Sequence, residues 1–495
     1  MPNTFIQSPS FIYVLLVVSI LLICSVLSSK ISSKIGVPTL LLFLGIGMLA
    51  GSEGPGGIDF TNYPLAYAIG SICLAIIIFD GGMRTDWKSV QPVLKTGISL
   101  SVFGTILTAL FTGLFAYSIF NLNLAEAFLL GSIISSTDAA AVFSILKSRN
   151  LTLKGHLKKT LEFEAGSNDP IAVFLTVSVL TFITSPEAGI FIFLKLFVTQ
   201  AILGLICGLF VGKGVQWLIN NVGIEYEGLY SVLLLGLIFF LFSLTTLLEG
   251  SGFLAVYVAG LVLGNLKILH KESIIKFQDG IAWIAQITVF LTLGLLVFPS
   301  NLFEVWKEGL ILALFLMFIA RPLSVLIAGK GKFFSWREKT LVSWVGLRGV
   351  APIILATLPW STGFVKAEYF FNLVFFVVLI TVLFQGMGIP WVANKLKVTE
   401  AADETSPLEI SQDLLPAGFI TIEINVTSGA PALDDRIVDL ALPSGVLLTS
   451  LKRDGRFLIP KGDTVIMKGD RIRGLARASS LSELENVFGN AKIIS

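Results

Sequence analysis

The sequence predicts an all-α polytopic membrane protein that carries a small cytoplasmic α+β domain at its C-terminal end. Of the 495 residues, 54% are hydrophobic and 14% are charged, and the mean hydropathy is +0.86. A soluble domain would carry about 25% charged residues. Apolar runs long enough to cross ~30 Å of hydrocarbon recur as far as residue 394, and a more polar segment with strand-like alternation follows.

We expect thirteen transmembrane helices. The second and ninth are short and rich in glycine, and polar residues interrupt the fifth and twelfth. In each pair the two helices are seven positions apart, which is the spacing expected of two inverted repeats. Close helix packing is the alternative explanation for the glycines. The predicted ranges are 10–28, 37–51, 65–81, 93–120, 125–147, 159–183, 189–212, 228–248, 252–265, 277–298, 303–328, 340–359 and 368–392.

Lysine and arginine are concentrated in the odd-numbered loops between these helices. The even-numbered loops hold only Lys307 and Lys366 and carry acidic residues such as Glu53 and Asp59 instead. Because basic loops remain in the cytoplasm, we expect the N-terminus outside and the C-terminal domain inside.

The chain divides into a transmembrane domain (1–394), a polar linker (395–416) and a C-terminal domain (417–495). In the last of these, 419–426 alternates with period two, as a half-buried strand does. We expect a short helix over 433–440 and a hairpin turn at the Asp-Gly pair after Arg453. A Gly-x-Gly-x-x-Gly loop is absent from the sequence, which argues against a dinucleotide-binding Rossmann unit.

Ionisable side chains fall inside three of the predicted helices, where they are costly and usually functional. At ~1.5 Å per residue, Asp169 lies about 15 Å deep, close to the membrane midplane, and Glu164 about half as deep. Arg348 lies roughly 12 Å deep, and Asp138 is close to the middle of its own span. Three spans therefore bring strong charges to similar depths.

The polar interruptions adjoin these charges. Ser135–Asp138 reads Ser-Ser-Thr-Asp and 346–349 reads Gly-Leu-Arg-Gly, and neither suits a continuous helix in lipid. We expect two broken helices that cross at the midplane, whose free backbone groups hold ions and side chains. For Asp138, a role in the ion site and a role as the cap of the second half-helix are both open and compatible.

Asp169 is the candidate carrier. A desolvated carboxylate favours its protonated form, and a hard monovalent cation would favour the ionised form. One carboxylate that holds either a proton or a cation is a minimal exchanger; the alternative is a structural salt bridge with Arg348. We expect Glu164 to pair with Arg348, because buried opposite charges are cheaper together than apart.

Other polar residues within the spans are interpreted as structural. Asp80 and Glu249 lie at helix ends and are expected to be solvated, and Gln286 and Gln385 to bond neighbouring helices. Arg321 is expected to extend to the interface or to pair with a carboxylate.

Composition excludes several classes. The three cysteines, Cys24, Cys73 and Cys207, lie in apolar runs and indicate neither a disulfide framework nor a zinc site. The two histidines, His156 and His270, lie in charged loops, and the net charge is only +2. The low net charge predicts no nucleic-acid partner. We also expect no enzymatic activity and no cofactor.

With Ser167-Asn-Asp-Pro170, Ser136-Thr-Asp138 and Gly346-Leu-Arg-Gly349, residues 10–394 resemble the monovalent cation:proton antiporters. They are most similar to the NhaP-type exchangers and the cell-volume-regulation potassium/proton antiporter group. The tail resembles the RCK C-terminal (TrkA-C) regulatory domain.

The resemblance implies a homodimer in a bacterial cytoplasmic (inner) membrane, in which a core domain moves like an elevator. It implies that Asp169 binds the monovalent cation or the proton, with Thr137 and Asp138 beside it and Glu164–Arg348 as a structural ion pair. Asn168 stands where electrogenic relatives have a second Asp, which implies electroneutral exchange. Ala139 and Ala165 differ from the Pro and Ser of some relatives.

The function expected is K⁺/H⁺ antiport regulated by the tail, with Na⁺/H⁺ antiport by the same mechanism as the alternative. A ligand-gated cation channel and an ion-driven solute symporter are more distant alternatives; the sequence has no Thr-Val-Gly-Tyr-Gly filter. RCK-like tails bind nucleotides or cyclic dinucleotides, and four tail arginines are candidate contacts, namely Arg453, Arg456, Arg471 and Arg473.

Overall fold

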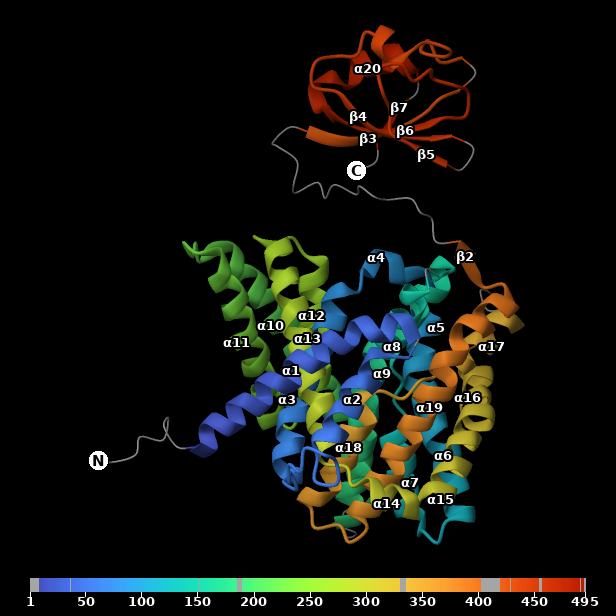
Figure 1. Ribbon diagram of the computed structural model, residues 1–495. Coiled ribbons are helices and arrows are strands. Elements are labelled where there is room, and N and C mark those ends of the chain that lie inside the picture. The colour runs from blue at the N-terminus through green and yellow to red at the C-terminus, as the bar shows by residue number, and fades with distance from the viewer. Residues whose placement is uncertain are drawn as a thin grey trace. The chain divides into compact units, whose positions relative to one another are not determined.

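Apolar helices form most of the molecule, and a small sheet domain follows them in the chain (Figure 1). The computed structural model describes residues 9–35, 37–149, 151–184, 189–329, 335–401, 419–427, 429–453, 456–489 and 491–493. The chain separates into two compact units, Met1–Ala402 and Asp403–Ser495.

Within the described residues of the first unit, nine helical stretches are long and apolar enough to cross a membrane, by length and composition. Seven are single helices: α1 (Pro9–Ile35), α3 (Tyr63–Arg84), α9 (Gly155–Thr184), α10 (Gly189–Asn221), α11 (Glu227–Leu247), α13 (Lys271–Leu295) and α19 (Ala367–Leu396). Four apolar helices are shorter: α2 (Thr39–Ala50), α7 (Leu124–Ile134), α12 (Gly252–Asn265) and α18 (Val350–Ser361). Every predicted range overlaps one of these stretches.

The other two long stretches are composite, and each contains a π-helical turn. One consists of α4 (Trp87–Val90), a 3₁₀ turn (Gln91–Val93), α5 (Leu94–Ile98), a π turn (Ser99–Gly104) and α6 (Thr105–Ile119). The other consists of α15 (Trp306–Phe315), a π turn (Leu316–Ala320) and α16 (Arg321–Ala328). They correspond to the fourth and eleventh predicted helices, again seven apart, and the Ser99 hydroxyl donates to the Ala328 carbonyl at 2.7 Å.

Glycines allow two pairs of helices to pack with their backbones in contact. Helix α3 packs along α12, and α2 packs along α13. A Cβ on Gly47 of α2 would lie 2.5 Å from the Leu291 carbonyl oxygen, and one on Gly260 of α12 would collide with the Phe79 carbonyl. In the predicted inverted repeats, α2 corresponds to α12 and α3 corresponds to α13. The glycines therefore allow the same kind of close helix packing in both repeats.

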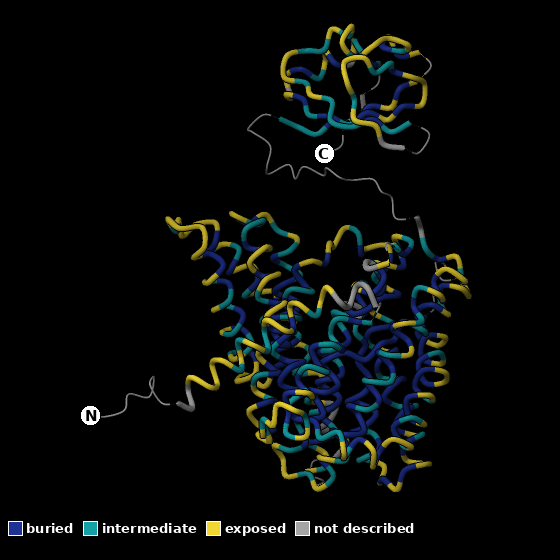
Figure 2. Tube along the Cα trace, viewed as in Figure 1, coloured by how far each residue is buried: buried dark blue, intermediate teal, exposed yellow. Residues whose placement is uncertain are grey.

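Burial in the first unit follows the expectation for a membrane protein. Buried residues occupy the interior, and many outward-facing residues are apolar, as along α1 and α10 (Figure 2). Phe210 on α10, for example, is 79% exposed. Apolar exposure on this scale suits lipid and would be a liability in water.

A two-stranded sheet joins distant parts of the first unit. Strand β1 (Leu151–Leu153) lies between α8 (Ala139–Ser148) and α9, and strand β2 (Thr399–Ala401) follows α19. They pair antiparallel, with Leu153 opposite Thr399. The remaining helices of this unit are α14 (Pro299–Glu304) and α17 (Trp336–Trp344).

The second unit is an antiparallel sheet in the order β5-β4-β6-β3-β7 with helix α20 (Leu481–Phe488). The strands are β3 (Phe419–Asn425), β4 (Leu447–Arg453), β5 (Arg456–Leu458), β6 (Arg471–Arg477) and β7 (Ala491–Ile493). Its core includes Ile424, Leu451 and Phe488. The α+β class and the first strand are as predicted. Strands β4 and β5 pair with Arg453 opposite Arg456, and the Asp-Gly pair of the predicted turn lies outside the described residues.

The expected helix over 433–440 is wrong. The segment forms turns and only a short 3₁₀ turn, Ile437–Asp439. Asp434 has a φ of +67°, and its amide donates to the Ile466 carbonyl at 2.9 Å. Long-range pairing therefore takes the backbone groups that a helix would use.

Candidate ion-binding site

Two broken helices cross at the centre of the first unit, as the sequence predicts. The break Ser135–Asp138 separates α7 from α8, and the break 345–349 separates α17 from α18. The Asp138 amide donates to the Leu347 carbonyl at 2.8 Å. Each break therefore satisfies a backbone group of the other, while the N-terminal ends of α8 and α18 keep free N–H groups and partial positive charge.

Asp138 caps the second half of its helix. Its Oδ1 accepts a hydrogen bond from the Ala141 amide, three residues further on, at 3.2 Å, and this is the N-cap geometry. A Cβ on Gly349 would collide with the Asp138 carboxylate, so only glycine permits the crossing here. Asp138 thus begins α8, whose first residue is Ala139.

Asp169 approaches the crossing from α9. Its carboxylate accepts a hydrogen bond from the Ser136 hydroxyl, which belongs to the break in the facing helix. The neighbouring Asn168 is buried, and its Nδ2 donates to Thr137 Oγ1 at 2.5 Å and to the Thr137 carbonyl at 3.3 Å. The four predicted site residues Asp169, Asn168, Thr137 and Asp138 are therefore brought together.

Pro170 lies inside α9, directly after Asp169. Proline has no N–H, so Gly166 loses the hydrogen bond that its carbonyl would otherwise receive from four residues ahead. Gly166 also lines the cavity described next. The helix is thus locally under-bonded at the level of the carboxylate.

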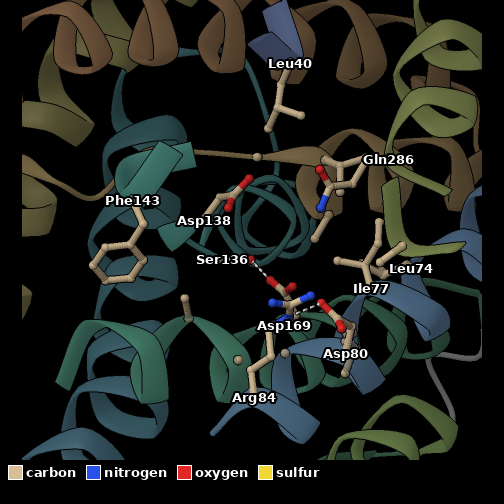
Figure 3. A pocket seen from close by; sticks show the side chains of 18 of the residues that line it. Leu40, Leu74, Ile77, Asp80, Arg84, Ser136, Asp138, Phe143, Asp169 and Gln286 are labelled. Carbon is tan, nitrogen blue, oxygen red and sulfur yellow. Dashed lines mark hydrogen bonds and ion pairs between the residues drawn. The ribbon is translucent and has the colours of Figure 1, made fainter. Parts of the chain in front are cut away.

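A cavity of about 330 Å³ leads to this carboxylate (Figure 3). The crossing lines it with Ser136, Thr137, Asp138 and Gly349, and α9 with Asp169. The opposite wall belongs to α3 and α13 and is mainly apolar; it includes Leu74, Ile77, Ile78, Ala282, Trp283 and Phe290.

Charged side chains mark the mouth of the cavity. Arg84, about half exposed, bridges Asp80 of its own helix at 2.7 Å and Asp279 of α13 at 2.5 Å. Glu162 of α9 also lines this region. The Asp80 side chain is only 16% exposed, so its expected solvation is wrong: it forms an ion pair at the end of α3.

The far end of the same helix is closed. The Tyr63 ring stacks on Trp360 with centroids 3.8 Å apart and an interplanar angle of 5°, and its edge meets Phe371. Gly70 lies on α3 between this aromatic stack and the cavity. A Cβ on Gly70 would lie 3.0 Å from the side chain of Ile354 on α18. The contact between α3 and α18 is thus tight at one end and open at the other.

The predicted ion pair between Glu164 and Arg348 is wrong. Glu164 pairs with Arg321 instead, through Oε1 and Nη2 at 2.6 Å, and both side chains are almost fully buried. Arg348 Nη1 donates to the carbonyls of Ser135 and Ser136 at 2.8 and 2.7 Å. Its charge therefore faces the C-terminal end of α7, where the helix dipole favours a cation.

Among known proteins, the sodium/hydrogen exchanger transmembrane family matches residues 17–395, and the TrkA-C domain matches residues 421–489. The chain belongs to the sodium/hydrogen exchanger family.

Relatives of this exchanger include both potassium and sodium antiporters. The "K(+)/H(+) antiporter NhaP2" of Shewanella sp. (strain ANA-3) is 39% identical over 483 residues, which cover 96% of this chain and 83% of the relative. The "K(+)/H(+) antiporter NhaP" of Alkalimonas amylolytica is 38% identical with the same coverage. The "Na(+)/H(+) antiporter NhaH" of Halobacillus aidingensis is 30% identical over 80% of this chain and 98% of its own.

A solved structure shares the exchanger fold. The sodium proton antiporter MjNhaP1 from Methanocaldococcus jannaschii at pH 8 superposes with a TM-score of 0.67. The match covers 77% of this chain and 99% of that chain at 24% identity. At this identity it supports the fold of the transmembrane unit.

The candidate arginines of the exchanger's tail differ in how far they are engaged. Arg453 binds the fully buried Asp470, through Nε at 2.9 Å and Nη2 at 2.7 Å, and so braces the domain internally. Arg473 Nε donates to Glu423 at 3.2 Å. Arg471 is exposed, and the side chain of Arg456 lies outside the described residues.

Sequence reasoning missed three features of the exchanger site. These are the Ser136 hydroxyl bound to Asp169, the ion pairs at the mouth, and Gln286, which lines the cavity and, among the residues that the structure describes, forms no hydrogen bond with a neighbouring helix. Ser136 carried a signal, because it lies within the break. Within the described residues there is no cluster of three or more His, Cys, Asp or Glu side chains suited to a metal.

Proposed function

We propose that this protein exchanges a monovalent cation, with K⁺ preferred, for H⁺ by alternating access at Asp169. The observation that carries the proposal is the carboxylate of Asp169, which lines a cavity and accepts a hydrogen bond from the Ser136 hydroxyl in the break of the facing helix. Proton and cation compete for the same oxygens, so bound H⁺ excludes the cation and bound cation excludes H⁺. The transported cation is the substrate, and no cofactor takes part.

Electroneutral exchange is supported by Asn168. Its amide holds Thr137 at the crossing, which is a structural use that adds no titratable group. Asp138 is engaged as a helix cap. Asp169 is then the carboxylate that changes state, and one cation moves for each proton.

Alternating access requires the crossing and α9 to move together against α3 and α13. The apolar wall is supporting evidence, because an apolar surface slides past a site without competing for its hydrogen bonds. The tight α3–α18 end, with its Tyr63–Trp360 stack, would open as the cavity closes. We place this movement in a homodimer.

For orientation, we propose a bacterial cytoplasmic membrane with the cavity open to the cytoplasm. The mouth at Arg84 adjoins the basic connecting segment that also holds Lys88 of α4 and Lys95 of α5. Because basic loops stay inside, the N-terminus would be outside and the tail inside.

K⁺ is preferred because relatives that match 96% of this chain, and hence most of the tail, are named K⁺/H⁺ antiporters. The Na⁺/H⁺ alternative uses the same oxygen groups and is supported by the named sodium relatives. Proteoliposomes with a pH-sensitive dye, challenged with K⁺, Na⁺, Li⁺ and Rb⁺, decide between them.

The decisive test is Asp169→Asn in such proteoliposomes, with exposed Asp59→Asn as the matched control. We expect cation-driven proton movement to vanish in the first variant and to persist in the second. Persisting exchange in Asp169→Asn overturns the proposal. Single-channel currents would favour a channel instead, and a need for an organic solute would favour a symporter.

The tail, we propose, regulates transport through the β1–β2 sheet. Strand β2 leads from α19 toward the tail, and β1 leads directly into the carrier helix α9. The Lys154 amide donates to the Val398 carbonyl at 3.2 Å, and Val398 packs in a core cluster with Leu153 and Leu157. A nucleotide or cyclic dinucleotide bound by the tail, with exposed Arg471 as a contact, would act along this path.

A further inference from the structure

Gln286 of α13 is the polar exception on an apolar wall. Along α13 the cavity is lined by Asp279, Ala282, Trp283, Gln286 and Phe290, which form one helical stripe. Asp279 is at the mouth, and Gln286 is two helical turns further in, about 10 Å along the axis. Beyond the mouth, the other described lining residues of α3 and α13 are aliphatic, aromatic or glycine, and among them the indole N–H of Trp283 is a donor that cannot bind a cation.

The amide of Gln286 faces the cavity. In Figure 3 it enters from α13, across from the ends of Asp138 and Asp169. In the part of the chain that the structure describes, no hydrogen bond from this side chain to another protein group is found, and the residue is half-buried. A half-buried amide that lacks protein partners must be satisfied by the contents of the cavity.

We propose that Gln286 is a specificity-determining residue that coordinates the cation on its way between the cavity and Asp169. This inference rests on the proposed function. The amide oxygen is a neutral ligand of the kind that hard cations accept, and it replaces a hydration water as the cation passes the apolar wall. Its N–H groups remain available to the carboxylate when a proton occupies the site.

Because Gln286 and Asp169 belong to elements that move against each other, their joint contact with the cation exists only when the site faces this cavity. Gln286 therefore sets cation affinity on the cavity side and leaves affinity on the opposite side unchanged. A residue that affected only folding would change the apparent KM on both sides of the membrane together, or would change the maximum rate.

The test is Gln286→Leu, assayed in vesicles of both orientations so that cation reaches the cavity side in one and the opposite side in the other. We expect the apparent KM for K⁺ to rise about fivefold on the cavity side, as for the loss of one neutral polar contact. The maximum rate and the opposite-side KM should remain as in the wild type. Gln286→Asn, which shortens the side chain by one methylene, should give a smaller rise and shift the K⁺/Na⁺ preference.

Gln278→Leu on the same helix is the matched control, because Gln278 is buried and does not line the cavity. We expect the KM of this variant for K⁺ to match that of the wild type on the cavity side and on the opposite side. An unchanged cavity-side KM in both Gln286 variants, or an equal rise on both sides, overturns the inference. Absence of cation/proton exchange in the wild type would instead overturn the proposed function, so the two failures are distinguishable.

Discussion

The carboxylate of Glu164 pairs with the guanidinium of Arg321 at 2.6 Å, within the buried interior and next to the helix crossing. Arg348 is thereby left to bind the carbonyls of Ser135 and Ser136. The two arginines thus have different tasks: Arg321 neutralises a carboxylate, and Arg348 holds the end of a half-helix.

A double-mutant cycle tests this division. Arg321→Met should destabilise the protein by about 3–5 kcal/mol, because it leaves the Glu164 charge buried and unpaired. Adding Glu164→Gln should recover a large part of that loss, and the melting temperature in detergent measures both steps. The same cycle with Arg348→Met in place of Arg321→Met should show weaker coupling, because Arg348 forms no direct ion pair with Glu164 in the described structure; coupling as strong as that of Arg321 would restore the pairing predicted from sequence.

Gly349→Ala tests the closeness of the crossing. The added methyl would collide with the Asp138 carboxylate and force the breaks apart. We expect the exchange rate to fall at least about tenfold, a loss of roughly 1.4 kcal/mol or more in transition-state terms, with a correctly sized protein in gel filtration. Gly45→Ala on α2, where a Cβ meets nothing within 4 Å, is the matched control and should transport normally.

Depth and motif predicted which residues gather at the helix crossing, but they did not predict which side of its helix each residue faces. Distance along a helix places Asp169, Asp138 and Arg348 at similar levels, and the structure brings Asp169 and Asp138 to one cavity. Which side of a helix a charge faces depends on packing against neighbours far away in sequence, and this is why Arg321 was not assigned to Glu164. The glycine contacts of Gly47 and Gly260 depend in the same way on partners that sequence spacing alone does not reveal.

The apolar ranges could be predicted from the sequence because hydrophobic length is a local property, and each predicted range overlaps an apolar helix of the described structure. The ion pairs at the mouth could not be predicted, since Arg84 reaches Asp279 across 195 residues. The short helix expected over 433–440 failed for the same reason: local propensity yielded to pairing with Ile466.

Two truncated chains distinguish the role of the tail from the role of the β1–β2 sheet. A chain ending at Ala402 keeps strand β2, whereas one ending at Lys397 loses it together with Val398. If the sheet positions α9, the longer chain should lose only tail regulation, while the shorter one should also lose several degrees in melting temperature and show a shifted pH profile of exchange. Equal behaviour of the two chains would exclude the sheet as the route.

The loop between α2 and α3 provides a pH prediction outside the spans. The Ser300 hydroxyl and amide both donate to the Glu53 carboxylate, the amide at 2.8 Å, and these bonds lower the pKa of Glu53 from its ordinary 4.5. The stabilisation is therefore fully present above about pH 4.5 and is lost as the pH falls through the lowered pKa. Melting curves between pH 3 and 7 should show this acid-side loss in the wild type and a smaller one in Ser300→Ala; identical slopes would contradict it.

The β1–β2 sheet fastens the beginning of α9 to the segment that leads to the tail. Thermodynamic linkage makes such a coupling reciprocal: if a tail ligand changes cation affinity at Asp169 by some factor, the cation changes the tail's affinity for that ligand by the same factor. The tail would then be a readout as well as a control. Its ligand occupancy would report to the cytoplasm how much cation the membrane site is carrying.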